Sequence, residues 1–427
     1  MDARSRGADL LAFVPAAEIP LIFLHVRYQA GTTVGPAHVY GSDVVIGLTL
    51  LAAVGAGLVY GWTPLARPRM LWIVAAAFLL FLGASCFWQP IEAPKTHLVT
   101  WAKLVEYALL APALVLLLRR RAQVNRFLTV FVVWCVAASG WGLLQFLGVV
   151  KEFEGYRPGQ REVSFLGIYD FAVFAGATLA IGLAGIVLGE RWRLVPVAVV
   201  AGGAGVVLAA SLFSYAGGLF AAAACGLVAL RGRTLTLRRA AAVVTILAVV
   251  GAGVAGLRGS DISDYLSFLG VTPAAKSQRH VETGPQRTML AYIGLRIWRD
   301  HPWFGVGFER SANRYQPYLA DTKRKFPGQD AQSYPSPAHP WGVQSFWIQL
   351  LADTGVVGFV LGVGTFVVGL ALALRAHARN PLLALVAVGW ILVAAGTWIG
   401  EGIVAGIPLQ AVTWLGLGLA ATVGGLE

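Results

Sequence analysis

The sequence predicts an all-α integral membrane protein with about twelve membrane-spanning helices, and three observations lead to that prediction. Of the 427 residues, 57% are hydrophobic and only 13% are charged, which is too few charges to cover a soluble domain. The apolar segments are about 17–25 residues long and uncharged at their centres, the length that a helix needs to cross a bilayer. They do not alternate apolar and polar residues as the strands of a membrane barrel do.

Twelve apolar spans follow one another along the chain, and a long hydrophilic interval separates the ninth from the tenth. We therefore expect nine spans within residues 1–257, an external segment at 258–345 and three spans within 346–427. The first span is the least regular, because it contains Glu18 and Pro20. The predicted spans lie near residues 9–24, 43–60, 70–87, 97–118, 124–147, 164–189, 194–210, 214–230, 240–257, 346–374, 381–399 and 403–425.

The distribution of Lys and Arg predicts the orientation of the spans. Alternate connections, such as 119–126 and 231–239, are rich in arginine, whereas the short connections on the other side hold few basic residues. Because cytoplasmic loops are enriched in Lys and Arg, we expect both termini in the cytoplasm and the segment 258–345 outside. The net charge of +12 therefore reflects topology, and no nucleic acid partner is predicted. The three cysteines lie in apolar runs without a CxxC spacing, so neither a disulfide nor a metal site is predicted.

Polar residues inside the spans are interpreted first as structural. Lys103 and Glu106 are three residues apart on one helix face and are expected to neutralise each other, with a cavity lining as the alternative. The small and hydroxylic residues from Ser211 to Gly218 favour close helix packing. Asp170 lies within a span and needs a partner, for which an arginine of the preceding loop is predicted.

The external segment 258–345 contains more basic than acidic residues and many aromatic ones, which suits an anionic group attached to a lipid. Residues 261–284 show no strong periodicity and are expected to wander over the outer surface. A capping pattern at Thr283 starts a helix whose apolar stripe is Met289, Ile293 and Ile297. We expect this helix to lie flat at the outer membrane interface and to end before Pro302.

Arg157 and Arg161 stand just before a predicted span, at the level of the lipid head groups. A guanidinium there can form a fork of two hydrogen bonds onto phosphate oxygens. The alternative is that these side chains only extend to the membrane interface, as long basic side chains often do.

Two runs of the chain carry a resemblance to a known family. The first contains Arg287 and continues through Ile297-Trp-Arg-Asp-His-Pro302 to Gly305-Val-Gly307, and the second is Gln349-Leu-Leu-Ala-Asp-Thr-Gly355-Val-Val-Gly358. Together with the predicted spans and the long external segment, they resemble the O-antigen ligase and polymerase superfamily. That resemblance implies a GT-C-like polytopic glycosyltransferase in the bacterial inner membrane. Such an enzyme moves a glycan from undecaprenyl diphosphate to an acceptor sugar hydroxyl on the periplasmic face, without metal or cofactor.

The resemblance also implies site residues. Arg287 matches the family's arginine at the start of the external helix, and His339 corresponds to the loop histidine that takes the acceptor's proton. A His-Asn pair common in the family is replaced here by Val343 and Gln344. Arg287, Arg161 and Arg157 are thus predicted to bind the diphosphate. Further contacts to donor or acceptor are expected from Arg310, Arg314, His301, Tyr215 and Gln344.

The residue pattern leaves alternatives open. His339 could instead be a loop histidine bonded to a backbone carbonyl, and the His301-Pro302 pair is explained as a helix stop. Within the family, a ligase and a polymerase differ only in the acceptor, a glycolipid or another glycan, and a protein O-oligosaccharyltransferase is a third variant. From another class, a transporter or flippase for a lipid-linked sugar would also be polytopic, although no internal repeat supports it.

Overall fold

A computed structural model describes residues 11–88, 94–155, 158–271, 283–327, 329, 331–339, 341–403 and 407–426. Within these residues the chain is mainly helical, as predicted. Seven helices are long and apolar enough to cross a membrane, and four shorter apolar helices accompany them. The helices of the first part are α2 (Val14–Ile22), α3 (Gly41–Tyr60), α4 (Arg69–Ser85), α5 (Pro94–Ala108), α6 (Leu110–Leu117), α7 (Arg121–Phe146), α8 (Ile168–Leu188), α9 (Leu194–Ala209), α10 (Leu212–Arg231) and α11 (Leu237–Leu257).

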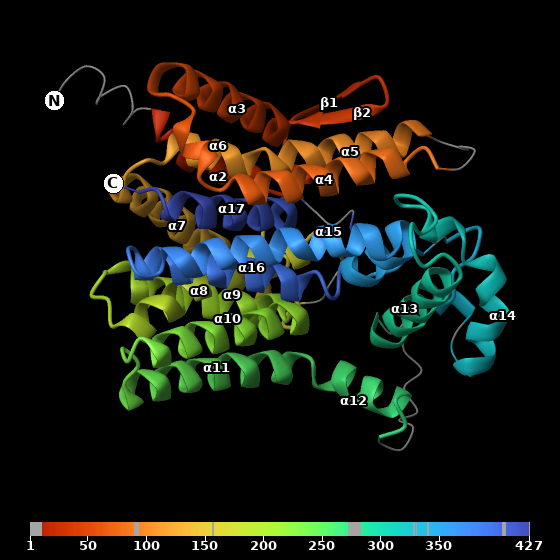
Figure 1. Ribbon diagram of the computed structural model, residues 1–427. Helices are drawn as coiled ribbons and strands as arrows, with labels where there is room; N and C mark the ends of the chain where they lie inside the picture. Colours follow the sequence, from red (N-terminus) through yellow and green to blue (C-terminus); the bar gives the residue numbers. More distant parts are fainter. Residues whose placement is uncertain are drawn as a thin grey trace.

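The remaining helices divide between one end of the bundle and its interior. At one end lie α12 (Gly259–Phe268), α13 (Thr283–Asp300) and α14 (Gln316–Lys325). The bundle is completed by α15 (Phe346–Ala376), α16 (Pro381–Thr397) and α17 (Ile407–Val423). The arginine-bearing connections between α8 and α9, α10 and α11, and α15 and α16 lie at the opposite end from α13 (Figure 1). This arrangement agrees with the predicted segregation of basic loops from the external segment.

Two elements were not expected from the sequence. An antiparallel hairpin of β1 (Gly31–Val34) and β2 (Ala37–Tyr40) lies between α2 and α3, with Gly31 opposite Tyr40. Its two-residue turn places Gly35 at a φ of 58°, a conformation that glycine adopts easily. The segment 261–284, which was predicted to have no regular structure, includes most of the helix α12, so that prediction was wrong. The helix α12 is short and follows directly from α11. The prediction missed it because its apolar residues do not recur at a clear helical spacing.

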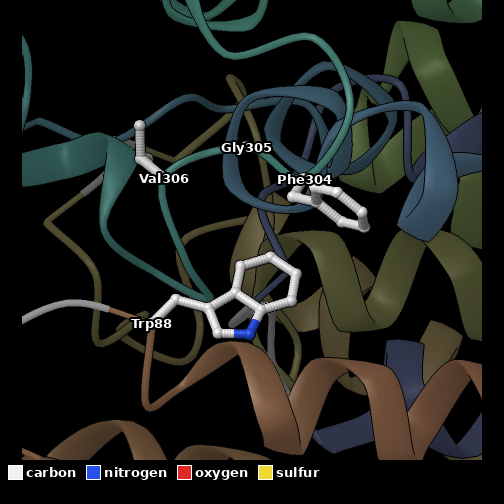
Figure 2. A pocket seen from close by; sticks show the side chains of 4 residues that line it. All are labelled: Trp88, Phe304, Gly305 and Val306. Atoms are coloured by element: carbon white, nitrogen blue, oxygen red, sulfur yellow. The ribbon is translucent and has the colours of Figure 1, made fainter.

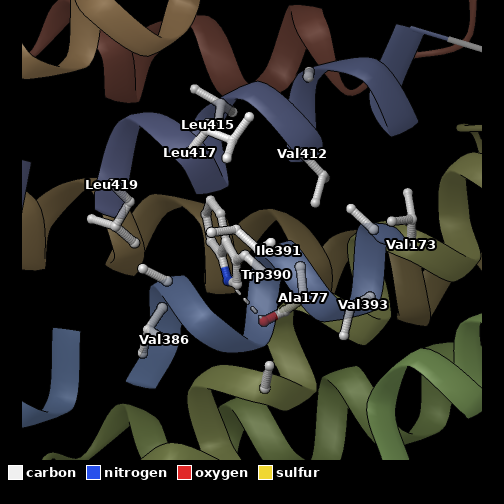
Figure 3. Close-up of a cluster of buried hydrophobic side chains, with 14 of the residues drawn as sticks. Val173, Ala177, Val386, Trp390, Ile391, Val393, Val412, Leu415, Leu417 and Leu419 are labelled. Carbon is white, nitrogen blue, oxygen red and sulfur yellow. Dashed lines mark hydrogen bonds between the residues drawn. The ribbon is translucent and has the colours of Figure 1, made fainter. Parts of the chain in front are cut away.

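The helices α8 and α16 form the centre of the bundle. Of the most apolar window of α8, 89% is buried by other parts of the chain, compared with 17% for α11. Figure 3 shows Trp390 of α16 between leucines of α17 and the helix α8, with its indole N–H donating to the carbonyl of Ala177 over 3.0 Å. This bond satisfies the one polar group of a fully buried side chain.

The packing of α10 on α16 confirms the role predicted for the small residues after Ser211. A Cβ at Gly396 of α16 would overlap the backbone of Gly217 in α10, so the two helices touch through backbone. The hydroxyl of Ser214 lies 3.0 Å from that of Thr397, which bridges the same pair of helices. Small residues thus allow the close approach, as is common between membrane helices.

The predicted pairing of Lys103 with Glu106 is confirmed, and the structure adds a third member. The two charged atoms lie 3.4 Å apart, and Asp43 of α3 also contacts Lys103. The predicted partner of Asp170 was wrong, however. This buried carboxylate accepts a hydrogen bond from the backbone N–H of Leu409 in α17 rather than from an arginine.

The two runs that carry the family resemblance fold onto each other as a unit that we call the glycine clasp, residues 302–307 paired with 352–357. The N–H groups of Val306 and Gly307 donate to the carbonyls of Ala352 and Asp353, over 3.1 and 2.7 Å. In return, Val356 donates to the carbonyl of Pro302 over 2.8 Å. Gly355 interrupts α15 with a φ of 64°, which frees these carbonyls for the clasp.

Glycine is required on both sides of the clasp. A Cβ at Gly305 would overlap the backbone of Asp353, and one at Gly355 would overlap that of Trp303. The Asp353 side chain ties the loop further, because it accepts hydrogen bonds from the backbone N–H groups of Glu309 and Ser311. The clasp therefore fixes the external segment onto α15.

Beside the clasp, Trp88, Phe304, Gly305 and Val306 line an open groove of about 400 Å³ (Figure 2). The edge of the Trp88 ring faces Phe304, with the ring centroids 5.6 Å apart. The groove is formed by the end of α4 and the first half of the clasp.

Candidate functional site

Arg287 lies in the second turn of α13 and is held by three parts of the chain. Its Nε donates to the side-chain oxygen of Gln344 over 3.1 Å, and one Nη donates to the hydroxyl of Tyr169 over 2.5 Å. The same Nη lies 3.4 Å from the carboxylate of Glu401. Gln344 precedes α15, Tyr169 belongs to the first turn of α8, and Glu401 lies between α16 and α17. The external helix is thereby joined to the core of the bundle.

The position of Arg287 follows from the packing of α13. The predicted stripe of Met289, Ile293 and Ile297 is buried, as expected, with each side chain at most 2% exposed. It packs against protein, including Ala352 of α15, and so does not lie flat with this face on the membrane as we predicted. Gly294, on the same helix face as Arg287, allows close approach to Val343, and this approach places Arg287 beside Gln344.

Aromatic rings surround the Arg287 guanidinium. Its central carbon lies 5.3 Å from the ring centroid of Tyr169 and 5.6 Å from that of Phe213. The guanidinium of Arg161 lies over the same Tyr169 ring, at 5.8 Å. Rings attract the cation without removing its charge, so both guanidiniums keep their capacity to bind an anion.

A third guanidinium joins them. Arg258, at the junction of α11 and α12, has a side chain only 11% exposed and forms an ion pair with Asp261 at 2.7 Å. Burial lowers the pKa of Arg258, and the positive charges of Arg161 and Arg287 act in the same direction. The three cations are therefore close enough to repel one another. We call Arg161, Arg258 and Arg287 the arginine cluster.

The loop that carries Arg161 is fixed by a buried amide. The side chain of Gln145, at the end of α7, accepts a hydrogen bond from the backbone N–H of Ser164 over 2.7 Å and donates to its carbonyl over 3.0 Å. This two-point contact holds Ser164 at a φ of 56°, which is unusual for a residue with a side chain. The strained turn points the loop toward the first turn of α8, where Tyr169 lies.

The carboxylate of Glu401 faces the arginine cluster from the connection between α16 and α17. Burial raises the pKa of Glu401 to about 7, although the nearby cations Arg287 and Arg161 lower it and Glu154 raises it. Sequence reasoning missed Glu401 and the site role of Arg258. The available signal was that each charged residue stands at the end of an apolar span, where ionisable side chains are often functional.

The structure brings only some of the predicted site residues together. Arg287, Arg161 and Gln344 meet as described, and Arg157 lies outside the described residues. His339 lies in the loop before α15 with an exposed side chain that stacks on Trp341, with the ring centroids 5.9 Å apart. Among the contacts of the described residues, none joins the His339 side chain to the arginine cluster. The prediction that it is the catalytic base stays a prediction.

The other predicted contact residues lie elsewhere. His301 is exposed, and its backbone N–H donates to the Ile297 carbonyl over 2.9 Å, which ends α13 as the His-Pro pattern indicated. Tyr215 donates its hydroxyl to the Leu247 carbonyl over 2.8 Å and so joins α10 to α11. Arg310 is buried beside the clasp, where it donates to the Cys86 carbonyl over 3.1 Å, and Arg314 is exposed.

A comparison with known families now bears on this geometry. Residues 197–363 match the family model described as O-antigen ligase. This match supports the resemblance to the O-antigen ligase superfamily that the sequence predicted. The match includes Arg258, Arg287 and the whole glycine clasp, whereas Arg161, Tyr169 and Glu401 lie outside it. No curated protein matches the chain.

The matched family indicates the coarse function. The protein is an integral membrane enzyme of the O-antigen ligase and polymerase type, which acts in polysaccharide biosynthesis. Its substrates are a lipid-linked glycan and an acceptor within the membrane. The arginine cluster is the part of the described structure whose charge suits such a lipid-linked anion.

Proposed function

We propose that the protein transfers a glycan from undecaprenyl diphosphate to a sugar hydroxyl of an acceptor glycolipid, as an O-antigen ligase does. The observation that supports this proposal is the arginine cluster beside Tyr169. Three half-buried or buried guanidiniums converge there at the end of the bundle that carries α13, and the basic connections lie at the other end. A diphosphate needs this kind of fixed cationic partner.

The transfer proceeds as a single inverting displacement on the outer face of the membrane. The acceptor oxygen attacks the anomeric carbon of the donor sugar, and the bond from that carbon to the diphosphate oxygen breaks. Negative charge then grows on the departing diphosphate. Guanidiniums that are already oriented by Tyr169, Phe213 and Gln344 stabilise this charge without reorganising, which is how fixed donors lower a barrier.

The arrangement of Arg287 favours donor binding in particular. Gln344 binds its Nε, and Tyr169 binds one Nη, which also makes the long contact to Glu401, so the guanidinium plane is held in place. Phosphate oxygens bound at the guanidinium edge would be held by charge-assisted hydrogen bonds. The acceptor is taken as a glycolipid by the family resemblance, and a growing glycan or a protein serine would need the same donor site.

The test uses purified protein in lipid nanodiscs with lipid-linked glycan extracted from the host membranes and glycolipid from the same membranes as acceptor. The wild type is expected to form glycosylated acceptor and free undecaprenyl diphosphate without any other protein. Movement of the donor across vesicle membranes with no transfer to acceptor would reject this function and would favour the transporter instead.

A further inference from the structure

Glu401 is placed so that it could react once the donor is bound. Its carboxylate lies 3.4 Å from Arg287, which is the longest of the three polar contacts of that guanidinium. Tyr169 and Gln344 hold Arg287 more closely, so the arginine does not depend on Glu401 for its position. The Glu401 side chain is 14% exposed, which leaves it reachable from the site.

We propose that Glu401 is a catalytic residue, the general base that takes the proton of the acceptor hydroxyl, and that the donor's diphosphate releases it from Arg287. In this structure, Glu401 occupies the anionic position beside Arg287 that a phosphate oxygen takes when the donor binds. This inference rests on the proposed glycosyl transfer, and it assigns a residue that neither the family match nor the sequence reasoning identified.

The diphosphate binds Arg287 and displaces the carboxylate, which is then unpaired and close to the bound sugar. As the acceptor oxygen forms its bond to the anomeric carbon, its O–H bond breaks and the proton passes to the Glu401 carboxylate. The electron pair of the broken glycosidic bond leaves with the diphosphate. The product is a neutral Glu401 carboxyl group, which returns its proton to water when the diphosphate departs.

The charged groups around Glu401 suit this role. The cations Arg287 and Arg161 interact electrostatically with Glu401, and so do the acidic residues Glu154 and Asp170. Burial already raises the pKa of Glu401 to about 7. Loss of the Arg287 contact and the arrival of a dianion both raise that pKa further, because each disfavours the carboxylate. A base is most effective when its pKa lies near the working pH, whereas an ordinary glutamate is too weak.

His339 is the rival base, predicted from the family resemblance. It differs from Glu401 in that its exposed ring stacks on Trp341, and its backbone is fixed by Ser336, which accepts from its N–H over 3.0 Å. Variants at the two residues therefore separate the two assignments.

The experiment compares wild type, Glu401→Gln, Glu401→Asp and His339→Ala in nanodiscs. Glu190→Gln is the matched control, because Glu190 lies in the connection between α8 and α9 at the far end of the bundle. Two quantities are measured for each: the dissociation constant of unsubstituted undecaprenyl diphosphate, and kcat with kcat/KM across pH 5–9. The glutamine is nearly isosteric and keeps the volume of the side chain, but it cannot accept the proton.

We expect Glu401→Gln to lower kcat about hundredfold or more, the usual contribution of a general base. Its affinity for undecaprenyl diphosphate should stay within about threefold of wild type or become tighter, because the competing carboxylate is gone. In wild type, kcat/KM should rise with pH through about 7, because the fraction of Glu401 in the carboxylate form increases. This rise of kcat/KM with pH should be absent in Glu401→Gln. Glu401→Asp should recover part of kcat, and the rise of its kcat/KM with pH should have its midpoint at a lower pH.

The inference is overturned if Glu401→Gln keeps kcat within about threefold of wild type, or if its kcat falls only in step with a weaker affinity for the diphosphate. The second result would mean that Glu401 merely orients Arg287. If Glu401→Gln fails to fold, Glu401→Asp provides the test. An unchanged midpoint in the rise of its kcat/KM with pH would contradict the assignment. A wild type that forms no product rejects the proposed function itself, which is a different result from an active wild type with an active Glu401→Gln.

Discussion

The glycine clasp and the arginine cluster both include residues of the external segment 258–345, yet they are built in opposite ways. The clasp is made of backbone: four hydrogen bonds between two peptide segments, with glycines where any side chain would collide. The cluster is made of three long side chains from separate parts of the chain, which meet around Tyr169. The most recognisable motif of the sequence is therefore a structural joint, and the charged site lies beside it.

This difference predicts different consequences of substitution. A change in the clasp should affect folding first, since it removes the joint between α13 and α15. A change in the arginine cluster should affect donor binding or turnover while the fold remains. The residues around these side chains are also held in place by other contacts.

Gly355→Val is expected to have the largest effect. The new side chain would overlap the backbone of Trp303, and valine is strained at the φ of 64° found there. We expect a loss of about 3 kcal/mol or more of unfolding free energy and little folded protein. Fluorescence-detected size exclusion in detergent measures the folded fraction. Gly218→Val in α10 is the control, because open space surrounds a Cβ at that glycine. Normal folding of Gly355→Val would contradict the role of the clasp.

Arg287→Ala is expected to leave the fold intact and to weaken donor binding about hundredfold. The estimate corresponds to the loss of charge-assisted hydrogen bonds to phosphate, at about 1.5–3 kcal/mol each. Binding of undecaprenyl diphosphate in nanodiscs measures it. Arg287→Lys should recover little, since an ammonium cannot reproduce the fork held by Gln344 and Tyr169. A variant that unfolds instead would place Arg287 with the clasp residues rather than with the site.

Arg161→Ala is expected to have a smaller effect of the same kind, about tenfold on donor affinity. The guanidinium carbon of Arg161 lies 5.8 Å from the centroid of the Tyr169 ring. Arg258 and Arg287 still supply positive charge when Arg161 is replaced. The same binding measurement applies, and its dependence on salt should also decrease as one cation is lost. An effect larger than that of Arg287→Ala would reverse the order of importance within the cluster.

His339→Ala is expected to have the smallest effect, a decrease in kcat of less than about threefold. The ring is exposed, stacks on Trp341 and has no contact with the cluster among the described residues. Turnover measured with the same donor and acceptor checks this. A decrease of a hundredfold or more would instead support the histidine predicted from the sequence as the base.

Much of the fold could be predicted because hydropathy and charge act locally. Apolar runs specified the helices, the stripe of Met289, Ile293 and Ile297 specified the buried face of α13, and Lys103 and Glu106 paired as their spacing indicated. The hairpin after Gly31 was missed because its short strands are exposed and have no apolar period.

The candidate site could be predicted only in part, since it is assembled from residues far apart in the sequence. Arg287 was predicted from the family resemblance, and Arg161 from its position just before a predicted span. Glu401 and Arg258 were missed because each looks like an ordinary charge at the end of a span. Only tertiary packing brings Glu401 next to Arg287, 114 residues away along the chain.

The most direct test of the account is a structure of the protein in nanodiscs with undecaprenyl diphosphate bound. We predict that the two phosphates lie among Arg161, Arg258 and Arg287, with the Glu401 carboxylate displaced from Arg287. Density for the phosphates at another place, such as the groove beside Trp88 and Phe304, with the ion pair of Glu401 and Arg287 still formed, would contradict it.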